Sequence, residues 1–260
     1  MPITLYAHRL SQPSRAAEIT LRELSIDYAF HEIDFAGGET RTPWYARINA
    51  FQTVPALVAD DDKGTDDDKG IGDKEKPLAL GESQAIMMYL CRTAPDRETA
   101  RRWYPGDQDA TRAARIDQWL AWHHGNLRRF DMFHHIMNLH LTLPMLKREI
   151  QSTLIAPLQA GLNQGLATLE AHFERQQNGA HPPTLLGDEH PTLADLAMSC
   201  ELHQIKAAGY RFDRYPHVTR WLEGMAERAH FKTVSEEVDA LGQEIQEQSG
   251  AYLALEEAFG

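Results

Sequence analysis

A strand that passes directly into a helix near the N-terminus constrains the fold of this chain most. Residues 3–7 (Ile-Thr-Leu-Tyr-Ala) alternate as a strand does, and Leu10-Ser11-Gln12-Pro13 then opens an amphipathic helix over 14–23. Such a turn aims backbone N–H groups and the positive end of the helix dipole at one point. A hydroxyl there, that of Ser11, can donate a hydrogen bond to an anion.

The same alternation of strands and helices continues through the first hundred residues. Further strands are expected at 28–34, 53–59 and 78–80, and further helices at 42–48 and 82–93. The order is βαβ, an irregular helix, then ββα. It predicts an α/β sandwich of the thioredoxin kind over residues 1–95.

An acidic segment over 60–76 interrupts this pattern between the third and fourth strands. It carries eight acidic and four basic residues and repeats Asp-Asp-Asp-Lys-Gly. A segment this polar cannot bury enough surface to offset its ordering entropy, so a solvated loop insertion is expected. A calcium loop is the alternative, but the spacing lacks the glutamate at position 12 of an EF-hand.

The second half of the chain is helical. A segment rich in Pro, Arg and Asp predicts a linker over 96–107, before an all-helical domain over 108–260. Helices are expected at 110–133, 154–175, 192–208, 216–230 and 234–246. Thr192-Leu193-Ala194-Asp195 has the pattern of a capping box with an acidic partner. The predicted fold class is therefore α/β plus all-α, a thioredoxin-like domain followed by a helical bundle.

Composition excludes several classes of function. The chain has 260 residues, no apolar run near the roughly 20 that span a bilayer, and no signal-peptide pattern, which predicts a cytoplasmic protein with no membrane partner. A net charge of −12 argues against nucleic acid. Cys91 and Cys200 form no Cys-x-x-Cys pair, so a dithiol redox motif is excluded.

Local motifs carry a resemblance over about residues 3–235. The sequence resembles the theta class of cytosolic glutathione transferases in six segments that occur in the expected order: Ser11-Gln12-Pro13-Ser14-Arg15-Ala16, Val54-Pro55-Ala56-Leu57, Glu82-Ser83-Gln84-Ala85-Ile86, Trp103-Tyr104-Pro105, Trp119-Leu120-Ala121-Trp122-His123 and Thr192-Leu193-Ala194-Asp195-Leu196. The resemblance implies glutathione as co-substrate, no bound cofactor, a role in detoxification and a homodimer.

Ser11 is the candidate catalytic residue, because a thiolate is a far better nucleophile than a thiol. Lowering a thiol pKa by about two units takes roughly 2.7 kcal/mol. One charge-assisted hydrogen bond supplies about 1.5–3 kcal/mol and a helix N-terminus up to about 1 kcal/mol. The alternatives are that Ser11 only caps the helix, or that Tyr6 is the hydroxyl that acts, as in other classes of the family.

Two further segments suit the backbone and the γ-glutamyl group of glutathione. The resemblance implies a cis bond at Val54-Pro55, which leaves the Val54 backbone groups to pair with the tripeptide. At Glu82-Ser83 the Ser83 N–H and hydroxyl can hold a carboxylate, and the Glu82 carboxylate can pair with an ammonium. Gln12 is a further predicted contact. Ordinary N-capping is the alternative reading of Glu82-Ser83.

At the glycine end of glutathione this chain departs from the theta pattern. Theta enzymes commonly carry a histidine and a lysine where this chain has Thr40 and Thr53. Arg41 and Gln52 are neighbours that can substitute, and Thr53 stays among the predicted contacts. The hypothesis is that Arg41 holds the glycine carboxylate, or that glutathione binds more weakly.

Arg128 is the second candidate catalytic residue, because the theta pattern brings an arginine from this helix close to the sulfur. A surface arginine is the alternative.

No metal is predicted. His123, His124, His134, His135 and His140 lack the spacing of a ligand set and no His-Glu-x-x-His occurs, so packing and surface histidines are expected.

The sequence thus predicts a theta-like glutathione transferase that joins glutathione to a small hydrophobic electrophile, with dehalogenase or peroxidase side activity possible. An apolar pocket is expected near Leu10, residues 130–137 and the C-terminal helix. The alternative is a non-catalytic ligand-binding or protein-interaction module on the same fold. The identity of the electrophile cannot be predicted from the sequence.

Overall fold

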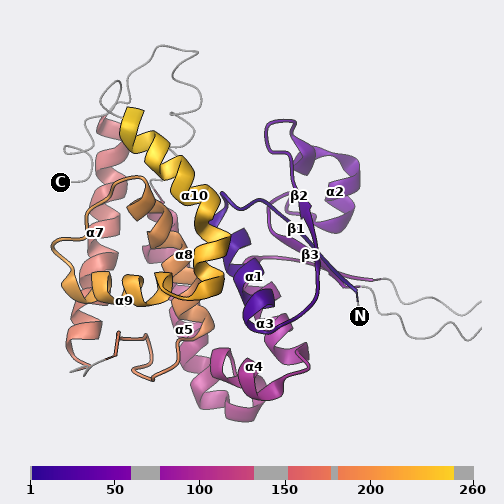
Figure 1. The fold of residues 1–260 in the computed structure, drawn as a ribbon, viewed down its shortest axis with the longest axis horizontal. Helices are drawn as coiled ribbons and strands as arrows, with labels where there is room; N and C mark the ends of the chain where they lie inside the picture. Colours follow the sequence, from indigo (N-terminus) through magenta and orange to yellow (C-terminus); the bar gives the residue numbers. More distant parts are fainter. Residues whose placement is uncertain (1, 60–76, 132–151, 177–180, 249–260) are drawn as a thin grey trace, which may run out of the picture. The chain divides into compact units, whose positions relative to one another are not determined.

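The chain divides into two compact units, Met1–Ala100 and Arg101–Gly260 (Figure 1). The computed structural model describes residues 2–59, 77–131, 152–176 and 181–248. The predicted acidic insertion 60–76 and the tail 249–260 lie outside the described residues. The division between the units falls inside the segment predicted as a linker.

The first unit is built on a four-stranded sheet in which all four predicted strands are present. The strands are β1 (Ile3–Ala7), β2 (Ala29–Glu32), β3 (Ala56–Ala59) and β4 (Leu78–Gly81), in the order β2-β1-β3-β4. β1 pairs parallel with β2 and antiparallel with β3, and β3 pairs antiparallel with β4. β3 starts three residues later than predicted. Pro55 has no N–H to donate to a ladder, and Gln52 has a φ of 54°.

Helices cover both faces of this sheet. On one face, α1 (Gln12–Glu23) packs against α3 (Ser83–Thr93) (Figure 1). The side chains of Leu5 and Ala7 of β1 are buried on this face. On the other face, α2 (Pro43–Ile48), which follows the short 3₁₀ helix η1 (Glu39–Arg41), contributes the buried Tyr45. Tyr45 packs with Ile33 and Ala56 in a second, smaller core.

The second unit is helical, as predicted. Its elements are α4 (Arg97–Trp103), which begins in the first unit, η2 (Gly106–Asp109), α5 (Ala110–Asn126), η3 (Arg128–Phe130), α7 (Ser152–Glu174), α8 (Leu193–Ala207), α9 (Pro216–Ala226) and α10 (Ala229–Gln248). α8 is buried on nearly every side and packs on α5, α9 and α10. Twelve of its fifteen residues are buried, and these include the polar residues Asp195, Ser199, Glu201 and Gln204, so α8 is the core helix of this unit.

The predicted capping box at the start of α8 is confirmed. Asp195 accepts hydrogen bonds from the backbone N–H groups of Thr192 and Leu185, both at 2.8 Å, and from the Trp221 indole N–H at 3.0 Å. Asp195 is fully buried. One carboxylate therefore caps α8, holds the preceding loop and ties α8 to α9.

The main differences from the sequence predictions are one helix that was not predicted and the boundaries of α5, α9 and α10. The predicted linker contains α4, a helix begun by the Asp96 side chain, which accepts from the N–H of Glu98 and Thr99. The helix predicted over 110–133 ends at Asn126, where Gly125 and Asn126 are weak helix formers, and the short 3₁₀ helix η3 follows. The helix predicted over 216–230 ends at Ala226, and α10 begins at Ala229.

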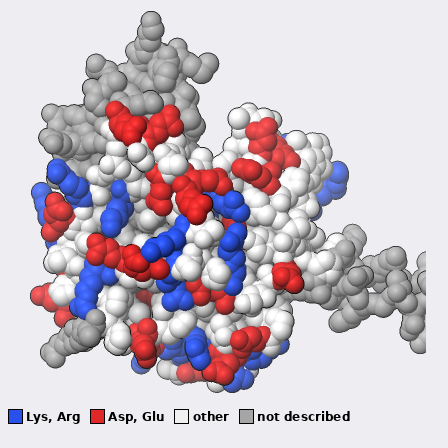
Figure 2. Space-filling model, viewed as in Figure 1, with Lys and Arg blue, Asp and Glu red and all other residues white. Residues whose placement is uncertain are grey.

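Charged side chains of both signs are interspersed on the face drawn in Figure 2. Among the described residues, no helix is both long and apolar enough to cross a bilayer.

Candidate functional site

Strand register brings three of the predicted site segments to one edge of the sheet. Tyr6 pairs with Ala56, and Ala56 pairs with Gly81, so these residues form a row across β1, β3 and β4. The chain beyond the end of β1, before the start of β3 and beyond the end of β4 therefore emerges at the same edge. Those stretches contain Ser11, Val54-Pro55 and Glu82-Ser83 respectively.

Ser11 lies at the N-cap of α1, and its hydroxyl is not used as a cap. Its backbone is extended (φ −86°, ψ 118°), and its side chain makes no capping hydrogen bond. Its N–H donates to the His8 carbonyl at 2.9 Å, and its carbonyl accepts from the Arg15 N–H at 3.0 Å. The backbone is thus fixed while the half-buried hydroxyl has no role in the cap. The reading of Ser11 as a cap alone is not supported.

Tyr6, the rival hydroxyl, lies in an aromatic cluster. Its ring centroid is 5.0 Å from that of His31 and 6.0 Å from that of Trp44. It packs against the smaller core that Tyr45 and Ile33 form. These contacts support the packing role that most strand tyrosines have.

The Val54–Pro55 peptide bond is cis, as the resemblance implied. The loop before it is held by Asn49 and Tyr45, because the Thr53 carbonyl accepts from Asn49 Nδ2 at 2.8 Å and from the Tyr45 hydroxyl at 2.7 Å. A Cβ on Gly81 would lie 2.8 Å from Asn49 Oδ1. The amide of Asn49 therefore packs directly on the end of β4, beside Glu82.

Glu82 occupies a strained backbone position. It is exposed at the N-cap of α3 with φ 63° and ψ 110°, outside the region that side chains other than glycine favour. A non-glycine residue there costs about 1–3 kcal/mol, and such strain gathers at functional sites. Ser83 is the first residue of α3, where free backbone N–H groups face an incoming carboxylate.

Residues predicted for the glycine end also lie together. The Arg41 guanidinium donates to the Gln52 amide oxygen at 3.4 Å; Arg41 ends η1, and Gln52 lies in the loop before β3. Arg41 and Thr53 are exposed, whereas Thr40 is buried. Gln12, the further predicted contact, is buried in the first turn of α1.

Arg128 lies in the second unit and not on a continuing helix, because α5 has ended at Asn126 and Arg128 begins η3. Its Nη1 is 3.5 Å from Glu201 Oε2 and 3.8 Å from Asp131. Buried His123 places Nε2 3.3 Å from the same Glu201 oxygen. Burial alone would raise the pKa of Glu201, but the His123 hydrogen bond and the Arg128 charge outweigh it and hold that pKa below its usual value.

The other predicted features of the second unit are only partly described. Residues 132–137 of the expected pocket, with His134, His135 and His140, lie outside the described residues. Phe130 packs on Gly161 of α7, where an added Cβ would lie 2.3 Å from the ring. His124 is exposed and its ring centroid is 5.6 Å from that of His123.

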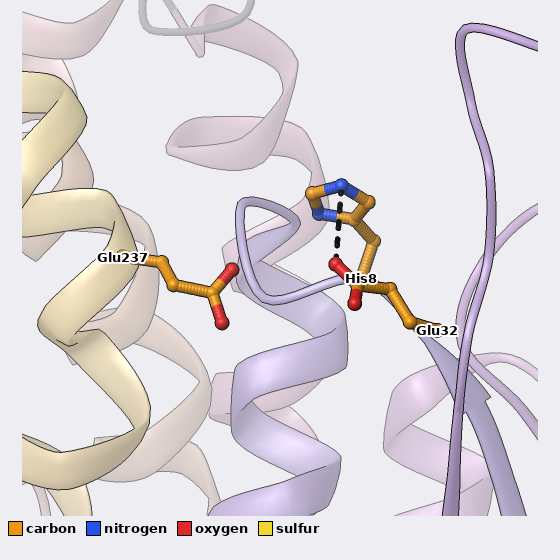
Figure 3. A group of neighbouring side chains, drawn as sticks. All are labelled: His8, Glu32 and Glu237. Carbon is orange, nitrogen blue, oxygen red and sulfur yellow. Dashed lines mark ion pairs between the residues drawn. The ribbon is translucent and has the colours of Figure 1, made fainter.

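Sequence reasoning missed the residues that anchor the turn before Ser11. Glu18 of α1 accepts from Arg9 Nε at 2.9 Å, from Arg22 at 2.8 Å and from the Tyr28 hydroxyl at 2.9 Å. His8 Nε2 lies 3.9 Å from Glu32 Oε1 (Figure 3). Glu237, the third residue that Figure 3 labels, belongs to α10 of the second unit. In the sequence, the only indication of this anchoring is a histidine and an arginine directly after the first strand.

A mixed sheet of order β2-β1-β3-β4 followed by a helical unit is the thioredoxin-like and all-helical architecture predicted from the sequence. Family models for the glutathione S-transferase N-terminal and C-terminal domains match residues 5–98 and 146–224.

Individual relatives agree with the family models. Human glutathione S-transferase theta-1 is 32% identical over 228 residues, covering 85% of this chain and 81% of that protein. Glutathione S-transferase T1 of Arabidopsis thaliana is 30% identical over 243 residues, covering 91% and 89%. A human glutathione transferase theta-2 structure, solved with glutathione and an unknown ligand, superposes with a TM-score of 0.70 at 26% identity, covering 96% of this chain and 90% of that chain. The chain belongs to the glutathione S-transferase family and resembles its theta class.

Proposed function

We propose that Ser11 donates a hydrogen bond to the sulfur of bound glutathione and keeps it a thiolate for attack on a small hydrophobic electrophile. The protein is a glutathione transferase, the activity for which its relatives are named, with glutathione as co-substrate. The observation that carries the serine proposal is that the Ser11 hydroxyl lies at the N-terminus of α1 and makes no capping hydrogen bond. A charge-assisted hydrogen bond and a helix N-terminus together can lower a thiol pKa by about two units.

The tripeptide contacts follow from the sheet edge. The Val54 backbone groups would pair with the cysteinyl backbone, the Glu82 carboxylate with the γ-glutamyl ammonium, and the Ser83 N–H and hydroxyl with the γ-glutamyl carboxylate. Gln12 would add a polar contact to the peptide. The strained φ of Glu82 supports this assignment, because capping alone does not require a glutamate in that conformation.

At the glycine end, the Arg41 guanidinium donates to Gln52, another of the predicted contacts, and this bond gives it a defined place. Arg41, with Gln52 and Thr53, would hold the glycine carboxylate in place of the missing histidine and lysine. Arg128 is proposed to stabilise negative charge during the reaction. Its pairing with Glu201 and Asp131 means that its guanidinium is already partly neutralised.

The proposed reaction is a displacement. The thiol proton leaves for solvent on binding, the thiolate electron pair forms a bond to carbon, and the leaving group departs with the electrons of the broken bond. Dehalogenation is this reaction with a halide leaving group. In peroxidase activity the same thiolate would attack a peroxide oxygen, so that the O–O bond breaks and the alkoxide leaves as an alcohol after taking a proton from water. A second glutathione would then convert the glutathione sulfenic acid to the disulfide and water. A cytoplasmic homodimer is proposed from the resemblance.

Retention on a glutathione column combined with turnover of alkyl halides, aryl halides and a hydroperoxide tests the proposal. Wild type should bind and turn over at least one electrophile, and Ser11→Ala should still bind but lose about 100-fold or more in kcat. Ser25→Ala, an exposed serine after α1, is the matched control and should behave as wild type. Binding without turnover across the panel would instead support the non-catalytic module, which the uncharged Thr40 and Thr53 favour.

A further inference from the structure

His8 makes three hydrogen bonds within the turn that joins β1 to α1. Its Nδ1 accepts from the Leu10 N–H at 3.2 Å, and its carbonyl accepts from the Ser11 N–H at 2.9 Å. Its own N–H donates to Ser14 Oγ at 3.4 Å. His8 therefore contacts the residues on either side of the Leu10–Ser11 peptide and the first turn of the helix.

The Leu10 contact fixes the tautomer of the neutral imidazole. A backbone N–H can only donate, so Nδ1 must be an acceptor, and in the neutral ring the proton is on Nε2. Nε2 faces Glu32 Oε1 at 3.9 Å, which is too long for a direct hydrogen bond, and the Glu32 side chain is 63% exposed (Figure 3). The ring also stacks on Phe35, with centroids 5.1 Å apart, so the Nδ1 hydrogen bond is its directional contact with the turn.

The neighbouring residue Arg9 is fixed independently. Its carbonyl accepts from buried Arg15 Nη1 at 2.8 Å, and its guanidinium pairs with Glu18. The turn is therefore held on one side by Arg15 and Glu18, and His8 Nδ1 supplies the side-chain bond at Leu10, the residue directly before Ser11.

We propose that His8 is a positioning residue for Ser11: its Nδ1 holds the Leu10 N–H and so sets the direction of the Ser11 hydroxyl toward the bound sulfur. This inference rests on the proposed role of Ser11. Hydrogen bonds weaken steeply as their angle departs from linear, so a turn held less firmly at the Arg9–Leu10 peptide, to which the Leu10 N–H belongs, stabilises the thiolate less. The proposed binding residues Val54 and Glu82 lie outside this turn, in the loop before β3 and at the N-cap of α3, so affinity for glutathione is retained.

The test compares His8→Asn with His8→Gln. The Oδ1 atom of asparagine lies about where Nδ1 of histidine lies and can accept from Leu10, whereas the glutamine amide reaches the position of Nε2 instead. The readout is the ultraviolet absorbance of bound glutathione thiolate as a function of pH, which needs no electrophile. His8→Gln should reduce the thiolate fraction at neutral pH and lower kcat about fivefold, with KM for glutathione unchanged, since one hydrogen bond of ordinary strength is lost. His8→Asn should restore both toward wild type.

Two further variants distinguish a failure of the His8 proposal from a failure of the proposed role of Ser11. Glu32→Gln should leave the thiolate titration unchanged, and a loss equal to that of His8→Gln would overturn the proposal in favour of the His8–Glu32 pair. Equal behaviour of His8→Asn and His8→Gln would also overturn it. Ser11→Ala is measured alongside. If it retains the thiolate, the proposed function itself fails, whereas a thiolate lost in Ser11→Ala and retained in His8→Gln overturns only the role of His8.

Discussion

Glu18 is a buried carboxylate, with a side chain only 1% exposed, that holds the helix behind the candidate catalytic turn. Its partners are Arg9, Arg22 and Tyr28. Burial raises the pKa of Glu18, but the hydrogen bonds from Arg9, Tyr28 and Arg22 and the charge of Arg9 outweigh it, so the pKa lies below its usual value. The charged form is therefore the one that the folded state favours.

Because the pKa of Glu18 is lowered, the free energy of unfolding depends on pH in the acid range. The contribution of Glu18 is complete above the usual glutamate pKa of about 4.3 and is lost as pH falls through its lower folded pKa. Glu18→Gln should reduce the free energy of unfolding at pH 7 by about 2 kcal/mol, discounted for the partly exposed arginines. Urea denaturation at pH 7 and pH 3 measures it, with exposed Asp27→Asn as control. An equal loss at both pH values would contradict a charged Glu18.

Arg41 carries the prediction for glutathione affinity. Arg41→Ala should raise KM for glutathione about tenfold at unchanged kcat, because a hydrogen-bonded charge pair contributes about 1.5–3 kcal/mol and this one is exposed. Steady-state kinetics with varied glutathione measure it. Exposed Arg47→Ala on α2 is the matched control and should leave KM unchanged. An unchanged KM in Arg41→Ala would exclude Arg41 as the carboxylate ligand.

At the scale of elements, close helix packing in the second unit depends on particular glycines. A Cβ on Gly242 of α10 would lie 2.4 Å from the Ala207 carbonyl oxygen at the end of α8, whereas a Cβ on Gly125 of α5 would meet nothing within 4 Å. The same substitution should therefore have opposite effects at the two positions.

Gly242→Ala should destabilise the protein by about 2 kcal/mol, because backbone atoms must move to admit the methyl group. Gly125→Ala should be neutral or stabilising by up to about 1 kcal/mol, since alanine is the better helix former. Thermal unfolding of both variants measures the difference. The packing of α10 on α8 would be contradicted by a Gly242→Ala variant as stable as wild type.

The existence and order of elements could be predicted because local patterns specify them. The strand at Ile3–Ala7, the proline at the start of α1 and the capping box at Thr192 and Asp195 were readable in the sequence. The helix α4 was missed because its seven residues form no apolar stripe, and the end of α5 was missed because Gly125 and Asn126 were read as helix interior. Short elements and their ends depend on capping contacts that periodicity does not report.

At the scale of the whole molecule, the order of the two units and the family followed from motifs. The contacts that hold the candidate site did not follow from them. The row Tyr6, Ala56 and Gly81 depends on strand register, and the anchoring of the turn by His8 and Glu18 depends on side chains that meet only after folding. Sequence reasoning proposed the residues that would face the substrate, and the structure adds the contacts that support them.

The acidic segment 60–76 supplies four of the twelve net negative charges, eight acidic less four basic residues, and joins strands whose ends already pair. Ala59 is the register partner of Leu78. Replacing 60–77 with an Asn-Gly turn should keep the fold and glutathione binding and raise the free energy of unfolding by about 1 kcal/mol, because the closed loop is shorter. Circular dichroism and glutathione-column retention check it. Loss of glutathione binding in a folded variant would assign the segment a role in the site.

The most direct test of the role of Ser11 is the pKa of the glutathione thiol when bound, measured by ultraviolet difference titration in wild type and Ser11→Ala. The bound thiol of wild type should titrate about two units below the free value of about 8.5, and Ser11→Ala should return it most of the way. A bound thiol with the same lowered pKa in both proteins would contradict stabilisation by the Ser11 hydroxyl.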